Sequence, residues 1–81
     1  MMVRVKLFAL AKQLTGLDEM TVEVADPSTI GALRRKLSDR DAEFAALVKR
    51  SLFAIGSDYA SDAREIRETD DIAMIPPVSG G

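Results

Sequence analysis

Residues 71–81, DIAMIPPVSGG, decide how the rest of this chain is interpreted. The first five favour a buried β-strand, and the two prolines that follow have no N–H to donate to a neighbouring strand. We therefore expect the sheet to end at Pro76, and Pro76 and Pro77 to begin an extended path. Gly80 and Gly81 have no Cβ and fit a channel too narrow for any other residue. At about 3.3 Å per residue, the segment from Pro76 onward reaches up to roughly 20 Å from the domain.

This ending indicates one folded domain over residues 1–75 and an extended, flexible C-terminal tail over residues 76–81 that is inserted into another protein. A frayed terminus is the alternative, because chain ends are often small, polar and disordered. A cloning scar also leaves glycines, but scars are not usually joined directly to a strand through Pro-Pro-Val. We favour the functional interpretation of the tail.

The composition makes most enzyme classes unsuitable. The chain has no Cys and no His, so it lacks a thiolate nucleophile, a Cys-based metal site and the commonest general base. Any chemistry must use carboxylates, lysines, hydroxyls or the terminus itself, and we expect no bound metal. The sequence shows neither a signal-peptide pattern nor an apolar run of membrane-spanning length, which favours a cytoplasmic protein with no membrane partner.

The charge is slightly acidic and unevenly distributed. A net charge of −2 and a pI of about 5.0 give no electrostatic basis for binding nucleic acid. From Ser51 onward, six acids against two bases give −4, so the first fifty residues carry +2. An acidic flank beside the tail suits a basic partner surface, although a solvated set of turns explains it equally well.

Alternating residues predict a first, half-buried strand over residues 2–8, with Val3, Val5 and Leu7 facing inward. Phe8 shares the parity of the exposed residues. In the alternative interpretation, the strand has already ended and Phe8 turns into the core.

A short helical turn is expected over residues 9–14, with Leu10 and Leu14 at i, i+4 spacing and Gly16 as its stop. Alternation then returns over residues 19–24 and predicts a second strand. The first part of the chain is thus a strand, a bent connection and a strand.

Residues 26–29 form a helix-start cluster, with Ser28 or Asp26 as the N-cap. Gly31 inside the main helix costs about 1 kcal/mol relative to Ala. Asp41 is expected to cap a second, short helix. The apolar stripes comprise Ile30, Leu33 and Leu37 in the main helix and Phe44, Leu47 and Val48 in the second. The basic residues expected to face water are Arg34, Arg35 and Lys36.

Residues 52–55 predict a third strand, and a short edge strand is expected around Tyr59 and Ala60. Ile66 is expected to be a single apolar residue that packs into the core before the last strand. This order predicts an α+β fold in which one main helix lies across a mixed sheet of four to five strands.

The first and last strands are expected to be central neighbours. If they run parallel, Phe8 and Ile75 end at the same edge of the sheet, next to the exit of the tail. Their exposed face then forms an apolar collar around the tail, which is typical of a docking site for a partner protein.

The chain resembles the small subunit of molybdopterin synthase, the MoaD family of sulfur carriers with a ubiquitin-like β-grasp fold. Three stretches carry the resemblance: VKLFA at residues 5–9 followed by Leu14, TIGALR at residues 29–34, and above all DIAMIPPVSGG at residues 71–81. The likeness covers the whole length. The turn residues Gly56-Ser57 and Thr69 to Asp71 depart from the family's usual pattern, and Gly31 stands where a helix former is expected.

The resemblance implies a sulfur-carrier function in molybdenum cofactor biosynthesis. An adenylating enzyme uses ATP to activate the carboxylate of Gly81, and a sulfur donor protein converts it to a thiocarboxylate. The tail then enters the large subunit of the synthase and donates sulfur to the cyclic pyranopterin precursor. No cofactor is bound by the chain itself, its catalytic groups are expected in the large subunit, and the family implies a heterotetramer.

The resemblance also assigns roles along the tail and its base. Gly81 carries the sulfur, and Gly80 gives clearance in the channel. The tail residues expected to contact or aim into the partner are Pro76, Pro77, Val78 and Ser79. Phe8 and Ile75 are the predicted docking residues.

Three alternatives remain at this point. A sulfur carrier of the thiazole pathway shares the fold and the Gly-Gly ending but usually lacks the two preceding prolines. A ubiquitin-related modifier is joined to lysines through Gly81. A pure interaction module has an inert tail.

Overall fold

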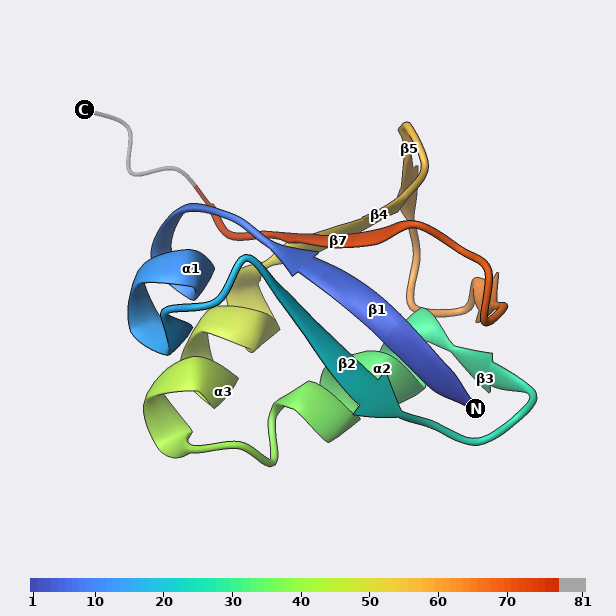
Figure 1. The fold of residues 1–81 in the computed structure, drawn as a ribbon, viewed down its shortest axis with the longest axis horizontal. Helices are drawn as coiled ribbons and strands as arrows, with labels where there is room; N and C mark the ends of the chain where they lie inside the picture. Colours follow the sequence, from blue (N-terminus) through green and yellow to red (C-terminus); the bar gives the residue numbers. More distant parts are fainter. Residues whose placement is uncertain (78–81) are drawn as a thin grey trace.

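A mixed sheet forms the centre of the domain in the computed structural model, which describes residues 1–77. The strand order is β2-β1-β7-β4-β5, and the helices lie together on one side of the sheet (Figure 1). The strands are β1 (Met2–Leu7), β2 (Glu19–Glu23), β4 (Leu52–Ile55), β5 (Asp58–Ala60) and β7 (Ile72–Ile75). The helices are α1 (Ala9–Thr15), α2 (Ile30–Leu37) and α3 (Ala42–Arg50), and a separate two-stranded sheet joins β3 (Ser28–Thr29) to β6 (Glu65–Ile66).

The two central strands, β1 and β7, run parallel, with Leu7 opposite Met74. The predicted neighbourhood of the first and last strands is therefore confirmed, as is the ubiquitin-like β-grasp class. On its other side β7 pairs antiparallel with β4, which places Leu52 opposite Ile75. Because Leu7 lies opposite Met74, Phe8 and Ile75 follow at the same end of the sheet.

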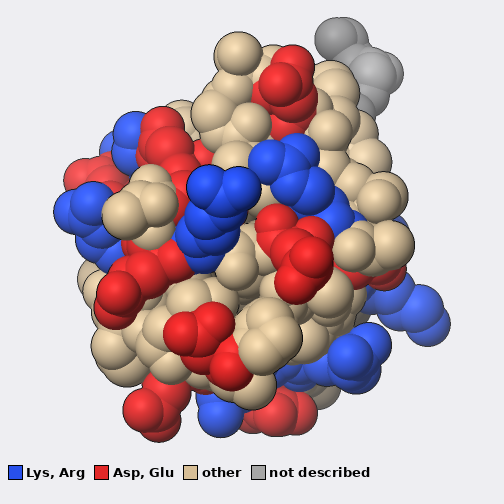
Figure 2. All heavy atoms as spheres, turned by 90° about the vertical axis from the view of Figure 1, so that its right-hand side faces the viewer, with Lys and Arg blue, Asp and Glu red and all other residues tan. Residues whose placement is uncertain are grey.

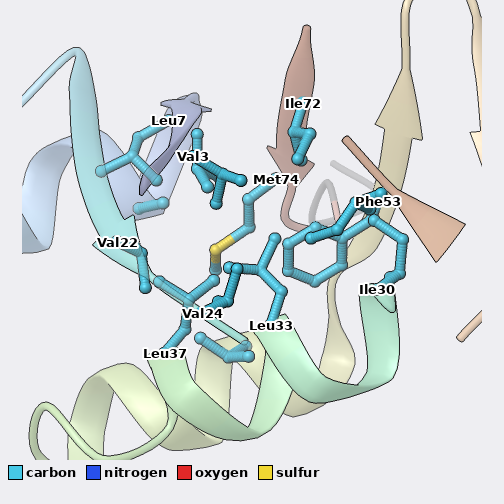
Figure 3. Close-up of a cluster of buried hydrophobic side chains, with 14 of the residues drawn as sticks. Val3, Leu7, Val22, Val24, Ile30, Leu33, Leu37, Phe53, Ile72 and Met74 are labelled. Carbon is cyan, nitrogen blue, oxygen red and sulfur yellow. The ribbon is translucent and has the colours of Figure 1, made fainter. Parts of the chain in front are cut away.

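The core lies between the sheet and the helices, and the predicted periodicities account for it (Figure 3). Strand β1 alternates exposed and buried residues throughout, as a sheet with one covered face requires. Burying these side chains supplies most of the driving force for folding, at about 25 cal/mol per Å² of apolar surface. The largest side chains that are fully buried include Phe44, Phe53, Ile30, Leu33, Ile72 and Met74.

Helix α1 lies where it was predicted, but the side that carries Leu10 and Leu14 faces solvent. Its C-cap is Gly16 in the left-handed conformation at φ 72°, which glycine adopts without a Cβ penalty. Leu10 and Leu14, whose spacing indicated the helix, are exposed, and Ala11 is the residue buried in the core. The i, i+4 spacing therefore marked the helix without marking its inner face.

The predicted N-cap of the main helix was wrong by one residue. Ser28 lies opposite Ile66 in the β3–β6 pair, so the chain is still extended where a cap was expected. The cap is Thr29, whose hydroxyl oxygen accepts a hydrogen bond from the backbone N–H of Ala32 at 3.2 Å. Helix α3 begins at its predicted cap, since a carboxylate oxygen of Asp41 accepts from the N–H of Phe44 at 2.8 Å. Helix α2, the predicted main helix, has eight residues, and α1 and α3 beside it have seven and nine.

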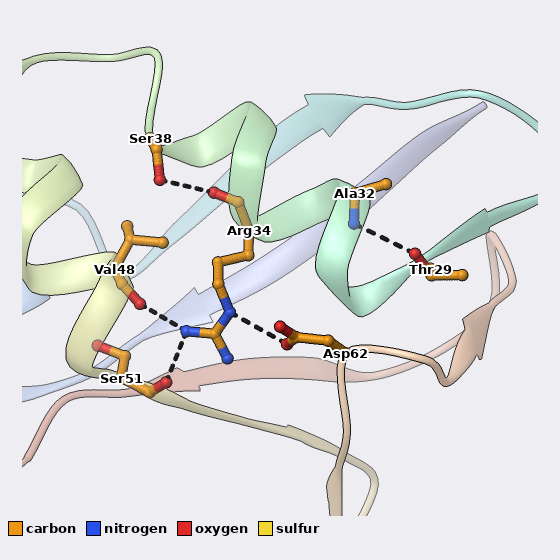
Figure 4. Close-up of polar contacts among 7 residues, drawn as sticks. All are labelled: Thr29, Ala32, Arg34, Ser38, Val48, Ser51 and Asp62. Atoms are coloured by element: carbon orange, nitrogen blue, oxygen red, sulfur yellow. Dashed lines mark hydrogen bonds and ion pairs between the residues drawn. The ribbon is translucent and has the colours of Figure 1, made fainter.

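Arg34 was expected to face water, and this prediction was wrong. One terminal nitrogen of Arg34 donates to the carbonyl oxygens of Val48, at 2.7 Å, and Ser51, at 2.9 Å. Its Nε donates to the carboxylate of Asp62 at 3.1 Å (Figure 4). The guanidinium carbon also lies 4.8 Å from the centroid of the Phe53 ring, in cation–π geometry. Arg34 thus joins α2 to the end of α3 and to the loop before β6.

Gly31 is explained by a close backbone approach. Its N–H donates to the carbonyl oxygen of Asp62 at 2.9 Å, and a Cβ at this position would stand 3.1 Å from that oxygen and 3.2 Å from the Asp62 Cβ. The glycine that weakens helix α2 locally therefore lets the Asp62 loop pack directly on the helix.

We expect Gly31→Ala to destabilise the domain by about 1 kcal/mol. Overpacking against a hydrogen-bonded backbone costs roughly 1–3 kcal/mol, and the better helix propensity of Ala returns about 1 kcal/mol. Urea unfolding measures the change. The matched control is Ala46→Gly on the exposed side of α3, which reports the propensity difference alone. A Gly31→Ala domain more stable than the wild type would contradict the close-packing explanation.

Candidate functional site

The candidate site is the end of the sheet from which the C-terminal segment leaves. Strand β7 ends at Ile75, as predicted. Pro76 is buried and Pro77 is exposed, so the chain remains packed on the domain for one residue beyond the strand. The predicted tail residues Val78, Ser79, Gly80 and Gly81 lie outside the described residues.

Phe8 stands beside this exit with its ring in solvent. Its backbone is extended, at φ −128° and ψ 159°, and it precedes the first turn of α1 as the N-cap. The side chain is 48% exposed, which decides between the two interpretations: Phe8 does not turn into the core. The structure thus brings together Phe8 and Ile75, the two residues predicted for docking.

Two further apolar residues of this face were missed by sequence reasoning. Leu52 lies opposite Ile75 and is 56% exposed, although its strand reads as a continuous buried run. Tyr59 lies opposite Ala54 in β5 and is 71% exposed. The alternation along β4 could have revealed Leu52. Because Phe53 and Ile55 are core residues, their neighbours in the strand must point to the other face of the sheet.

These side chains define what we call the outer apolar face. Ala54 lies opposite Ala73, and Leu52 lies opposite Ile75, so small residues occupy the centre and large ones the rim. An exposed apolar surface of this kind is typical of a protein interaction site. The outer apolar face consists of Phe8, Leu52, Ala54, Tyr59, Ala73 and Ile75.

Two acids of the C-terminal half pair with bases of the N-terminal half on the described part of the domain. Asp71 pairs with Lys6 at 3.3 Å, and Asp62 pairs with Arg34 at 3.1 Å. In the side view of Figure 2, acidic and basic residues are interspersed. Bases from the N-terminal half therefore offset part of the acidic charge expected beside the tail.

The described residues contain neither a metal-binding cluster nor a membrane-spanning helix. Within residues 1–77, no three His, Cys, Asp or Glu residues are grouped so that they could bind a metal ion. None of the helices in this part of the chain has the length and apolar character needed to cross a membrane.

Comparison with known proteins identifies the family. The model of the ThiS family matches residues 5–81 of this chain. This chain belongs to the ThiS family. Among its relatives there is the molybdopterin synthase sulfur carrier subunit of Dictyostelium discoideum, 36% identical over 96% of this chain and 94% of the relative. The resemblance to the MoaD family is thereby confirmed.

Solved structures of ThiS-like proteins agree with the fold. A putative molybdopterin converting factor, subunit 1, from Pyrococcus furiosus is 26% identical over 95% of this chain and 98% of that chain, with a TM-score of 0.77. A protein–protein complex of subunits 1 and 2 of the molybdopterin-converting factor from Helicobacter pylori contains a chain that superposes with a TM-score of 0.70 at 21% identity, covering 100% of both chains. At that identity the second match is evidence for the fold alone.

Proposed function

We propose that this chain is the sulfur-carrier subunit of a molybdopterin synthase and that Gly81 carries the sulfur. The observation that carries the proposal is the position of the last strand. Strand β7 is central in the sheet and ends at the outer apolar face, so the PPVSGG sequence begins at a surface suited to docking. The name of the Dictyostelium discoideum relative supports the same function.

The proposed chemistry begins with activation of the terminal carboxylate. A carboxylate is a poor electrophile until one oxygen becomes a good leaving group. On an activating enzyme, an oxygen of the Gly81 carboxylate attacks the α-phosphorus of ATP, and pyrophosphate leaves. A hydrosulfide equivalent from a sulfur donor then attacks the carbonyl carbon and AMP leaves, so that a thiocarboxylate remains.

The second part of the reaction takes place in the large subunit. The thiocarboxylate sulfur attacks an oxygen-bearing carbon of the cyclic pyranopterin precursor, the carbon–oxygen bond breaks, and the departing oxygen takes up a proton from an acid of the large subunit. Water then hydrolyses the bond between the Gly81 carbonyl carbon and the sulfur, which returns the carboxylate and leaves the sulfur on the precursor. The acid, base and phosphate-binding groups lie in the partners, so the isolated chain has no turnover.

The roles proposed for the tail follow from its residue types. Gly80 and Gly81 lack side chains that would obstruct a narrow channel. Val78 and Ser79 contact the channel walls, and the prolines limit the directions in which the tail leaves the domain. A chain without cysteine has no thiol of its own that could capture the activated acyl group.

The experiment is an incubation of the purified chain with ATP, its activating enzyme and sulfide, followed by intact mass spectrometry. We expect one exchange of oxygen for sulfur at Gly81, and sulfur transfer to the pyranopterin precursor once the large subunit is added. Lysine-linked adducts would favour a protein modifier instead. An unchanged mass would favour an interaction module with an inert tail, and transfer only to a thiazole-forming enzyme would assign the other pathway.

Replacing Phe8 by alanine is expected to weaken binding to the large subunit by roughly 1–3 kcal/mol, the range for an aromatic interface anchor. Isothermal titration calorimetry on the folded protein measures this change. Met2→Ala is the matched control, since Met2 has nearly the same exposure, 47% against 48%, and lies at the opposite end of β1. A lower melting temperature with unchanged binding would instead make Phe8 a structural residue.

A further inference from the structure

We propose that the open edge of β2 and the groove beside α2 bind an extended segment of a partner protein, which adds to the sheet as a further strand. Its side chains alternate between apolar residues that enter the groove and basic residues on the outer face of the sheet. This site is separate from the outer apolar face and from the end of β7.

The backbone of β2 is available for such pairing. Within residues 1–77, strand β2 is at one edge of the sheet and β1 is its single strand partner. The N–H of Leu7 donates to the carbonyl of Asp18 at 2.8 Å, and that of Val24 donates to the carbonyl of Met1 at 2.9 Å. Because hydrogen-bonded pairs alternate in an antiparallel ladder, Thr21 and its neighbours two residues away direct their N–H and C=O groups away from β1.

A groove runs along this edge on the side of the helices. One depression of about 310 Å³ is lined by the half-buried Met20, by the buried Val22 and Leu37, and by polar residues that include Glu23, Lys36, Asp39 and Arg40. Figure 3 shows Val22 and Leu37 on facing elements. A second, of about 440 Å³, continues it past Val24. Both depressions include Lys36, which therefore stands midway along the groove. Alternate side chains of an added strand would point into this groove.

The charges of β2 disfavour a second copy of the chain, paired symmetrically about Thr21, as the occupant. Thr21 is flanked by Glu19 and Glu23, which are exposed on the outer face. In a two-fold symmetric pairing about Thr21, each Glu19 lies opposite a Glu23, and like charges directly opposite are destabilising. A segment with basic residues at these two positions gains two favourable cross-strand pairs instead. Between them, the half-buried side chain of Met20 in the groove suits an aliphatic residue.

The proposed site is not on the strand that leads into the C-terminal segment. Strand β1 lies between β2 and β7, so the groove and the start of the tail are on different strands (Figure 1). Main-chain hydrogen bonds supply affinity in strand addition, and the pockets for alternate side chains supply specificity. A partner held at β2 can thus remain bound while the tail is charged or unloaded.

The test uses the full chain labelled with ¹⁵N and a capped peptide of sequence lysine–valine–threonine–valine–lysine, titrated to millimolar concentration. We expect amide shifts and slower hydrogen exchange at Thr21 and Glu23, and shifts near Leu37. A second peptide with glutamate at both ends should bind about three- to tenfold more weakly, as two reversed charge pairs predict. Absence of shifts at β2, or equal binding of both peptides, would overturn the proposal.

Two variants separate the backbone and the charge contributions. Thr21→Pro removes an outward N–H without breaking the β1 ladder, and should abolish peptide binding in a chain that still folds. The double variant Glu19→Lys, Glu23→Lys should prefer the glutamate peptide, and it tests the proposal even if the proline variant does not fold. Unchanged binding by a folded Thr21→Pro chain, or dimerisation of the wild type that this variant removes, would overturn the assignment.

Discussion

Deleting Gly81 is expected to abolish sulfur transfer and to leave the fold unchanged. Removal of one residue shifts the terminal carboxylate by about 3.3 Å, and a displacement of about 1 Å at a reacting centre already costs on the order of 100-fold in rate. The described core is complete by Pro76, so no buried contact described here is lost. Single-turnover transfer to the pyranopterin precursor and the melting temperature measure the two effects.

The control for this deletion is Ser79→Ala, which keeps the length of the tail. We expect this variant to transfer sulfur far better than the shortened chain, because the position of the reacting carbon is preserved. Sulfur transfer at the wild-type rate by the shortened chain would remove the basis of the proposed function. The proposed peptide site at β2 would survive that result, because its test reports binding and not transfer.

Arg34→Met is expected to produce the largest loss of stability among the substitutions proposed, roughly 3 kcal/mol. A hydrogen bond to a charged group contributes about 1.5–3 kcal/mol, and removing the donor leaves the carbonyls of Val48 and Ser51 without it. The side chain is 21% exposed, so screening of its ion pair with Asp62 is partial. Since small domains are stable by only about 5–15 kcal/mol, urea unfolding should show a clear shift of the midpoint.

Arg35→Met is the matched control for this prediction. Arg35 directly follows Arg34 in helix α2 but is exposed. Substitutions at exposed sites usually change stability by less than about 0.5 kcal/mol. Arg34→Lys should give an intermediate loss, because an ammonium group keeps the charge but not the planar fork. Equal destabilisation by the two methionine variants would show that general charge, and not the contacts of Arg34, stabilises the domain.

The sequence by itself determined the faces of the main elements. Period-2 alternation identified the inward residues of β1, and the stripe Ile30, Leu33 and Leu37 identified the buried side of α2. Asp41 was found as a cap because capping is a contact within one turn, here to Phe44. The sequence also predicted that the first and last strands are neighbours, but it left their relative direction open, and the register of Leu7 with Met74 shows that they run parallel.

Only the tertiary structure decided which distant segments meet. Thr29 became the cap because Ser28 pairs with Ile66, 38 residues away in the chain. Arg34 is partly buried because the C-terminal end of α3 and the Asp62 loop both contact it. The close approach of the same loop requires glycine at position 31. Leu52 belongs to the outer apolar face only through its register with Ile75. Periodicity reports which side of an element is inward, whereas the residue across from it depends on strand pairing between segments far apart in the sequence.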